Sequence, residues 1–454
     1  MPSRASRSAL PTIRAFRALR YEPEAVGDVG LVVSPPYDVI SPPEHARLLA
    51  RHQKNAVRLD LPAQLPGDAP DERYRRAART FAEWRSDGTF HKDPRAAVYV
   101  YEQTYRLPGT AVERTQRGFF ARLWLEPLAD GSGVLPHERT MAAPKEDRYK
   151  LLRATGANMS PVVGLYREST GRTAALLASI ATRPPAVAVR DDDSVEHRLW
   201  VVPQGDSPAG DVDVAGELLG LAASGPITIA DGHHRYETAL RYREERRMSR
   251  SCEEDPAFDY ILALLLDATH EPLTVLPTHR VVLGAGGSED DGRGLLATAE
   301  SLFEVRPAAR GELLAGFGGE GLASGGRGRF GLWTRAGGAF LEARREAFRA
   351  LLPSGGEAMR HLDVTLLGVA LDRLAGIDSE ALSAGGRVDY TKSVAEALAR
   401  VDNRAEGADA AFLLEPTPVR DVLAVAAEGD VMPQKSTYFF PKALTGLVIN
   451  PLEW

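Results

Sequence analysis

Cysteine is nearly absent from this chain, which has one, Cys252, among its 454 residues. An intramolecular disulfide framework and a cysteine-based zinc site are therefore both excluded. Long apolar runs are absent too: none reaches 18 residues, and the positively charged start at 1–21 has no continuous apolar segment. Because membrane spans and secretory signals need such runs, we predict a cytoplasmic protein with no membrane partner.

Positive charge is not in excess. The chain carries 55 lysine and arginine residues against 62 aspartate and glutamate residues, which gives a formal charge of −7. We therefore expect no nucleic-acid partner. Hydrophobic residues make up 44% of the chain, which is enough for a sizeable core, and the length favours two or three domains. The sequence leaves the oligomeric state open.

Two common phosphate-binding glycine motifs are missing. The glycine-rich stretches at 284–294 and 316–328 do not match G-x-x-x-x-G-K-[ST], and no G-x-G-x-x-G opens a helix after a strand. Neither a P-loop nor a Rossmann site is supported. Because their composition disfavours ordered packing, we predict that these stretches are surface loops around a smaller second domain.

The apolar residues that are present follow two kinds of pattern. Short apolar runs, several of them alternating with period two, predict strands at 31–34, 56–62, 97–107, 117–128 and 410–416. Helical spacing predicts helices at 42–53, 71–88 and 417–430, the last with Thr417 as N-cap and Pro418 at N1. The continuous apolar run 258–268 predicts a central strand covered on both faces. These elements indicate an α+β protein with a mixed sheet.

The sharpest functional signal is the turn at 231–235, which joins the apolar strand ITIA to a predicted helix at 236–247. A helix start directs free N–H groups and positive partial charge at one point, so this turn predicts an anion site for a phosphate or pyrophosphate. The alternative is that Asp231 caps the helix while the histidines pack locally. The candidate phosphate-binding residues are Gly232, His233, His234 and Arg235.

A charged loop follows residue 135. Glu138 stands between His137 and Arg139, and a carboxylate so placed can serve as general base for a hydroxyl nucleophile if its surroundings tune its pKa. A solvated charged loop is the alternative. The candidate substrate contacts in and after this loop are His137, Arg139, Lys145 and Arg148.

Lysine and hydroxyl side chains stand together near the end of the chain. Lys435, Ser436 and Thr437 combine a charge with directional donors, a phosphate-binding composition. The alternative is a tail docked by the aromatic residues 438–440. Magnesium needs only one or two carboxylates besides substrate phosphates. The candidate metal ligands are Asp231, Asp38 and Asp60, with turn or strand-edge roles as the alternative for the last two.

Three of these segments resemble the ParB/sulfiredoxin-like superfamily and, within it, the free L-serine kinases. DGHHR at 231–235 is similar to the superfamily's phosphate-binding turn. Pro136-His137-Glu138 is similar to the stretch that carries the kinases' catalytic base, and 410–441 is similar to the end of those kinases. The whole chain also resembles a bacterial family of uncharacterised proteins, through PPYDVI, LPHERTM, PKEDR, ANMSPV, ADGHHRYETAL and PQKSTYFFPK.

The chain also departs from these families. Asp231 follows Glu138 by 93 residues, a longer interval than in the kinases, so an insertion must be accommodated before both share a site. Tyr438 and Phe439 replace a hydroxyl-and-histidine pattern of the kinases. His233 stands where sulfiredoxins need a catalytic cysteine, which excludes their chemistry, and the helix-turn-helix of ParB proteins is missing.

The resemblance implies a ParB-like catalytic core with insertions at 1–285 and a smaller α/β domain at 286–454, whose segment 431–454 returns to the site. It implies a kinase that transfers a phosphoryl group to a hydroxyl, with free L-serine as the best candidate acceptor. ATP, ADP or pyrophosphate would be the donor, with Mg²⁺. Glu138 and Asp231 would be catalytic, and the alternative is a ParB-like nucleotide-binding or nucleotide-hydrolysing regulator without an acceptor. The donor would be bound by Gly232, His233, His234, Arg235, Lys435, Ser436 and Thr437.

Overall fold

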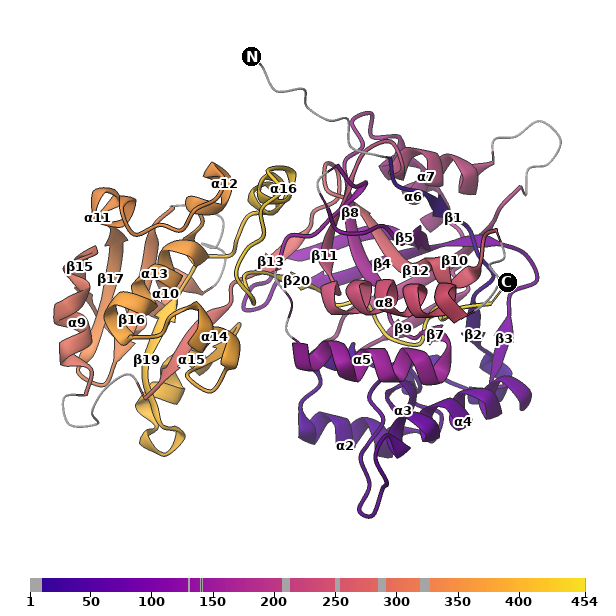
Figure 1. Ribbon diagram of the computed structural model, residues 1–454, viewed down its shortest axis with the longest axis horizontal. Coiled ribbons are helices and arrows are strands. Elements are labelled where there is room, and N and C mark those ends of the chain that lie inside the picture. The colour runs from indigo at the N-terminus through magenta and orange to yellow at the C-terminus, as the bar shows by residue number, and fades with distance from the viewer. Residues whose placement is uncertain are drawn as a thin grey trace.

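The computed structural model describes residues 10–129, 131–138, 140, 142–205, 213–249, 254–284, 291–318 and 327–453. Two bodies lie side by side, each built around its own sheet (Figure 1). The larger body has a nine-stranded mixed sheet and the smaller one a six-stranded antiparallel sheet. The prediction of a mixed α+β protein is therefore confirmed.

The nine-stranded sheet forms the core of the larger body. Its strands lie in the order β6 (Val134–Leu135), β11 (Ile227–Asp231), β8 (Val162–Tyr166), β12 (Tyr260–Asp267), β5 (Glu113–Trp124), β4 (Ala97–Arg106), β10 (Glu196–Pro203) and β9 (Val187–Arg190), with β1 (Ile13–Arg14) also paired to β5. The pairs β6–β11 and β8–β12 are parallel. Every residue of β12 is buried, so the predicted central strand is confirmed.

Helices cover both faces of this sheet. They are α1 (Pro23–Val26), α2 (Pro42–Arg51), α3 (Val57–Asp60), α4 (Glu72–Ser86), α5 (Ala142–Thr155), α6 (Arg172–Ala181), α7 (Val214–Ala222) and α8 (His233–Ser249), with the 3-10 helices η1 (Val29–Leu31), η2 (Tyr37–Val39) and η3 (Ala257–Asp259). Apolar side chains of α6, α7 and α8 pack on one face, and α5 lies against α8 (Figure 1). The chain end covers the other face, and α4 packs against α3 and α5. The helices predicted at 42–53 and 71–88 are confirmed as α2 and α4.

Two predicted strands are wrong. The segment 31–34 begins in η1, and the segment 56–62 contains α3. The Asn55 side chain explains both, because it donates to two carbonyls of the first segment at 2.8 and 3.1 Å and accepts the first N–H of α3 at 3.0 Å. Such local side-chain bonds to the backbone compete with a strand ladder.

The smaller body packs helices against the six-stranded sheet. Its strands lie in the order β15 (Phe303–Ala308), β17 (Gly337–Ala343), β16 (Arg329–Thr334), β19 (Ala408–Leu413), β14 (His279–Leu283) and β18 (Val388–Thr391). Its helices are α9 (Arg293–Ala299), α10 (Arg310–Phe317), α11 (Arg345–Arg349), α12 (Glu357–Arg360), α13 (Asp363–Ala375), α14 (Ser379–Ala384), α15 (Val394–Asp402), η5 (Arg404–Glu406) and α16 (Val419–Ala427). Because β14 is part of this sheet, the smaller body draws on residues that precede position 285.

The end of the chain leaves the smaller body and packs into the larger one. Strand β20 (Tyr438–Phe440) pairs with β13 (Thr274–Leu276) between the two bodies, and β21 (Asn450–Pro451) pairs with β7 (Ala157–Asn158). The remaining two-stranded sheet joins β2 (Leu19–Tyr21) to β3 (Phe90–Lys92). This return carries residues 433–442 past the start of α8. Helix α16 starts one residue later than predicted, with Pro418 as its N-cap.

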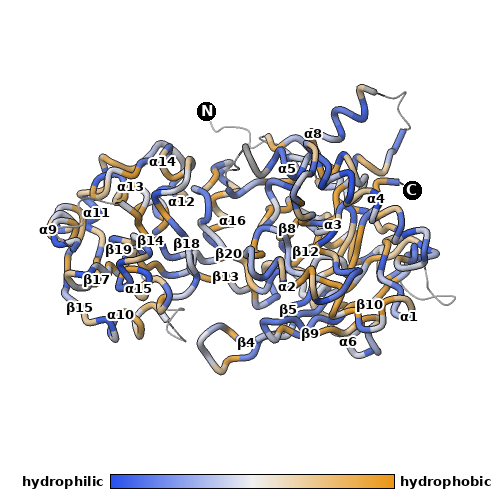
Figure 2. Tube along the Cα trace, turned by 90° about the horizontal axis from the view of Figure 1, so that it is seen from below, coloured by the Kyte–Doolittle hydropathy of each residue, from blue (hydrophilic) through white to orange (hydrophobic). Residues whose placement is uncertain are grey.

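Hydrophobic residues are concentrated in the interior of both bodies, and β13 and β20 lie between the bodies in this view as well (Figure 2). None of the helices that the structure describes is long and apolar enough to cross a membrane.

Candidate functional site

Three segments far apart in sequence meet where β11 ends and α8 begins. The N–H of Met432 donates to the carbonyl of His137 at 2.8 Å, and Glu138 and Met432 form a parallel bridge. The N–H of Lys435 donates to Glu138 Oε1 at 2.9 Å. The ammonium group of Lys442 is ion-paired with Asp231. The 93-residue interval between Glu138 and Asp231 is therefore accommodated, and the C-terminal segment closes the arrangement.

His137 links the three segments. Its side chain is fully buried, and burial lowers its pKa to about 4, so the imidazole is neutral near pH 7. Nδ1 donates to the carbonyl of Ile229, which leaves Nε2 to accept from the Thr437 hydroxyl at 3.0 Å. The backbone N–H of His137 donates to His233 Nε2 at 3.3 Å. Both imidazoles therefore hold the framework of the site.

Glu138 is a carboxylate of this junction that remains partly accessible. Its side chain is 19% exposed, and burial raises its pKa to about 7, against the opposing effects of the Lys435 N–H and charge. A carboxyl group with a pKa near the working pH can accept a proton and release it again at useful rates. The environment thus has the property that a general base requires.

Asp231 is held as an anion. Arg235 donates to its Oδ2 at 2.6 Å, and Lys442 pairs with its Oδ1. Burial alone would raise the pKa of Asp231, but these two cations lower it below its usual range. The ammonium group of Lys442 also lies 4.4 Å from the centre of the Tyr438 ring. Asp231 therefore fixes two cations beside the start of α8.

The backbone between β11 and α8 turns sharply at Gly232, whose φ is +90°. A Cβ at this position would lie 3.1 Å from both Val162 Cα and Arg235 Nε, so the turn requires glycine. The N–H of Tyr236 donates to the carbonyl of Gly232 at 3.0 Å as the helix begins. The N–H groups that precede it belong to the positive end of α8, which suits an anion.

The remaining predicted residues lie at varied distances from this junction. Lys435 is exposed with φ +57°, Ser436 is buried and donates to the Pro433 carbonyl, and Thr437 contacts His137. Lys145 donates to Glu237 at 2.8 Å. The pKa of His234 is lowered by burial, with the charges of Lys435, Asp38 and Lys145 also acting on it. Arg139 lies outside the described residues. Thr417, the predicted N-cap, instead donates to the Ser436 carbonyl at 3.2 Å.

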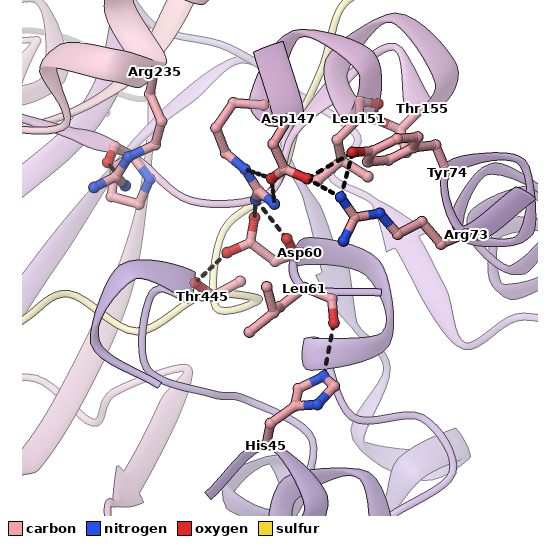
Figure 3. Close-up of polar contacts among 12 residues, drawn as sticks. His45, Asp60, Leu61, Arg73, Tyr74, Asp147, Leu151, Thr155, Arg235 and Thr445 are labelled. Atoms are coloured by element: carbon pink, nitrogen blue, oxygen red, sulfur yellow. Dashed lines mark hydrogen bonds and ion pairs between the residues drawn. The ribbon is translucent and has the colours of Figure 1, made fainter. Parts of the chain in front are cut away.

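Arg148 and Asp60 belong to a second buried charge cluster, which includes Asp147, Tyr74 and Arg73 (Figure 3). The Arg148 guanidinium contacts both carboxylates and lies 3.9 Å from the ring centre of Tyr37. Its donors are therefore used within the protein.

Two of the three candidate magnesium ligands form ion pairs with cationic side chains of the protein. Asp231 is paired with two cations and Asp60 lies against Arg148. Asp38 is exposed, and its charge acts on Arg235 and His234. Elsewhere among the described residues, ligand atoms of Glu168, Asp267 and His270 lie within 4.8 Å of one another.

Three further cations lie at or near the junction. The composition of 433–442, which includes Lys442, predicts phosphate binding, whereas a turn or strand-edge role is the prediction for Arg280 and the sequence predicts no role for Lys392. Arg280 donates to the Lys435 carbonyl at 3.3 Å, and Lys392 lies 4.0 Å from the Tyr438 ring centre. Neither follows a recognisable spacing, because strand pairing in the smaller body determines where both residues lie.

A protein-family model described as "Protein of unknown function (DUF1015)" matches residues 13–365, which is more than half of the chain. The chain belongs to this family. The family-level resemblance that the motifs suggested is thereby confirmed. The DUF1015 match contains Glu138 and the turn at 231–235 and ends before the segment 433–442. No curated protein matches this DUF1015 chain.

Several solved structures are similar to this DUF1015 chain at low identity. A conserved hypothetical protein from Pyrococcus furiosus is 14% identical, with 68% of this chain and 87% of that chain covered and a TM-score of 0.31. A free serine kinase in complex with AMP is 12% identical, with 68% and 83% covered and a TM-score of 0.33. SbnI with a C-terminal truncation, from Staphylococcus aureus, is 10% identical, with 70% and 84% covered and a TM-score of 0.35.

Proposed function

We propose that this protein is a small-molecule kinase that transfers a phosphoryl group to a hydroxyl, with free L-serine as the first acceptor to test. The observation that carries the proposal is Glu138: a partly accessible carboxylate with a pKa raised to about 7, beside a helix start and several cations. The motif resemblance to free L-serine kinases supports the choice of acceptor.

The reaction assigns one task to each group of residues. Glu138 accepts the proton of the acceptor hydroxyl while the oxygen of that hydroxyl bonds to the transferred phosphorus. The bond from that phosphorus to the bridging oxygen of the donor breaks, and the shortened donor leaves with the electron pair. Phosphoryl transfer needs mainly alignment and neutralised charge, which a helix start and cationic side chains supply.

The donor phosphates are assigned to the start of α8 and to the segment that closes over it. The N–H groups at Gly232, His233 and His234 offer directional donors, while Lys435 and Lys442 supply charge. Arg235 helps indirectly, since it holds Asp231 in place for Lys442. ATP, ADP and pyrophosphate all present the phosphates that this arrangement recognises.

Magnesium fits the site in one respect. A hydrated Mg²⁺ would neutralise phosphate charge when bound, and it requires only one or two protein carboxylates. Asp38 is exposed and electrostatically close to Arg235 and His234, so it is the most open of the three candidate ligands.

The test is phosphorus NMR of the purified chain with Mg²⁺ and, in turn, ATP, ADP or pyrophosphate, each with and without L-serine. A phosphomonoester signal that requires serine supports the kinase and identifies the donor. Donor hydrolysis that is indifferent to serine supports the alternative, a nucleotide-hydrolysing regulator. No reaction with any donor contradicts both.

A further inference from the structure

A cavity of about 380 Å³ opens in the smaller body, beside the site. It lies between helices α12, α13 and α14 and the segment 431–434. Pockets of about 300 to 1,000 Å³ bind drug-sized ligands, so this one has far more room than a three-carbon amino acid needs. Its apolar walls include Leu351, Met359, Val364, Val369, Leu371 and Leu382.

Arg280 is the buried cation of this cavity. Its residue is 5% exposed, and its guanidinium donates to the carbonyls of Thr278 and Lys435 and lies 5.3 Å from the ring centre of Tyr390, another lining residue. Burial lowers the pKa of Arg280. Removing a charge from water is costly unless an opposite charge matches it. The two carboxylates of the lining, Asp372 and Asp378, are exposed, so the buried charge that the cavity offers to a ligand is the cation of Arg280.

The cavity and Glu138 are joined through one residue. The N–H of Lys435 donates to Glu138, whereas the carbonyl of Lys435 accepts from Arg280. The charge of Glu138 also acts on Arg280 and raises its pKa. A ligand whose anionic end reached Arg280 would therefore have its neighbouring atoms close to the proposed base.

We propose that this cavity binds the acceptor, and that the acceptor is a hydroxylated carboxylate with an apolar body larger than serine. Its carboxylate binds Arg280, its hydroxyl lies toward Glu138, and its apolar part packs against Met359, Val364 and Leu371. The proposal rests on the proposed function and deepens it, because it names the substrate class. A nucleotide phosphate is the other anion that Arg280 could recognise, and the experiment distinguishes the two.

Gly368 allows the cavity to be filled without strain. It lies in α13, lines the cavity, and a Cβ added there meets nothing within 4 Å. Gly368→Leu therefore places a side chain in the space while improving helix propensity. The matched control is Gly220→Leu in α7, where an added Cβ also meets nothing within 4 Å and which does not line the cavity.

Calorimetric titration of the full chain without donor uses four probes: N-hexanoyl-L-serine, L-serine, N-hexanoylethanolamine and AMP. The acylated serine should bind at least tenfold more tightly than serine, which lacks the apolar body, and than the ethanolamide, which lacks the carboxylate. Gly368→Leu should weaken its binding at least tenfold, and Gly220→Leu should not. Equal binding of the acylated serine and the ethanolamide would overturn the proposal. It would also be overturned if Gly368→Leu lost binding of AMP but kept binding of the acylated serine.

The phosphorus NMR assay separates this inference from the proposed function. If Gly368→Leu phosphorylates L-serine normally and also binds the acylated serine normally, the kinase stands and the cavity proposal is wrong. If the acylated serine binds in the expected pattern but neither it nor serine is phosphorylated, the cavity binds a hydroxylated carboxylate and the kinase is wrong.

Discussion

Glu138 and Asp60 are two carboxylates whose pKa burial raises, and their surroundings separate them. The Asp60 side chain is 7% exposed, and its oxygens face the Arg148 guanidinium and the Thr445 hydroxyl, each at 3.4 Å. The Glu138 side chain is 19% exposed and accepts the backbone N–H of Lys435. One carboxylate is matched by a buried cation, whereas the other keeps access to solvent.

A raised pKa therefore does not by itself mark a functional carboxylate. Asp60 belongs to a cluster whose donors and acceptors satisfy one another (Figure 3), which is how proteins accommodate buried charge. Glu138 lies where three segments meet and where a ligand can still approach. Substitutions should therefore affect stability at the first carboxylate and turnover at the second.

The largest expected effect is on stability at the Asp60 cluster. Arg148→Met leaves the Asp60 carboxylate buried without its cation, so we expect the free energy of unfolding to fall by about 3–5 kcal/mol. Urea unfolding followed by circular dichroism measures it. The control is Arg349→Met, which removes an exposed pair with Glu346 and should change stability by no more than about 0.5 kcal/mol.

The charge itself can be tested at the same cluster. Adding Asp60→Asn to Arg148→Met removes the uncompensated carboxylate, so part of the lost stability should return. If the double variant is no more stable than Arg148→Met alone, lost packing rather than unmatched charge explains the lower stability. The claim that Asp60 differs from Glu138 by its buried cation would then be wrong.

The next effect is on turnover. Glu138→Gln keeps the size of the side chain but removes the base, so kcat should fall by about 10²-fold or more, as for loss of general base catalysis. Donor affinity and the urea midpoint should stay close to those of the parent chain. Unchanged kcat would remove Glu138 from the mechanism, and a collapsed urea midpoint would make it a structural residue like Asp60.

Donor binding should respond to Lys442. Lys442→Met removes a charge beside the α8 start and leaves Arg235 as the cation on Asp231. Because charged hydrogen bonds contribute about 1.5–3 kcal/mol, the KM for the donor should rise about tenfold or more while kcat changes less. Lys150→Met, which removes a surface pair with Asp71, is the control. A rise in KM of equal size in both variants would contradict the assignment.

Local sequence pattern was sufficient to predict the elements whose structure depends on neighbouring residues in the chain. The strand before Asp231, the helix after it and the buried strand β12 all follow from hydrophobic period and a glycine turn. The failures at 31–34 and 56–62 have one cause, because a single side chain, Asn55, supplies the bonds that replace a ladder. No local sequence pattern predicts these hydrogen bonds of the Asn55 side chain.

The sequence predicts which residues belong to the site, but it does not predict which of them contact one another. The sequence indicates that Glu138, the 231–235 turn and the Lys435 segment matter, because each has a recognisable composition. It does not indicate that Lys435 bonds to Glu138, that Arg148 is consumed by Asp60, or that Arg280 faces a cavity. Lys435 lies 297 positions from Glu138 and Arg148 lies 88 positions from Asp60, and one sequence does not encode such distant contacts locally.

The smallest expected effect is a displacement of the pH profile. With a Glu138 pKa of about 7, the carboxylate that accepts a proton predominates above pH 7 and is lost below it, so kcat should rise through that region and then level off. The positive charge of Lys435 lowers this pKa. Lys435→Met keeps the backbone N–H but removes the charge, so the pKa of Glu138 should rise and the acidic limb should move to higher pH. At saturating donor, kcat should then differ from the parent mainly below the plateau. If the acidic limb stays at the same pH in Lys435→Met, Lys435 acts on Glu138 through its N–H alone. If the parent chain shows no acidic limb at all, Glu138 is not a titrating base, and this difference between Glu138 and Asp60 is wrong.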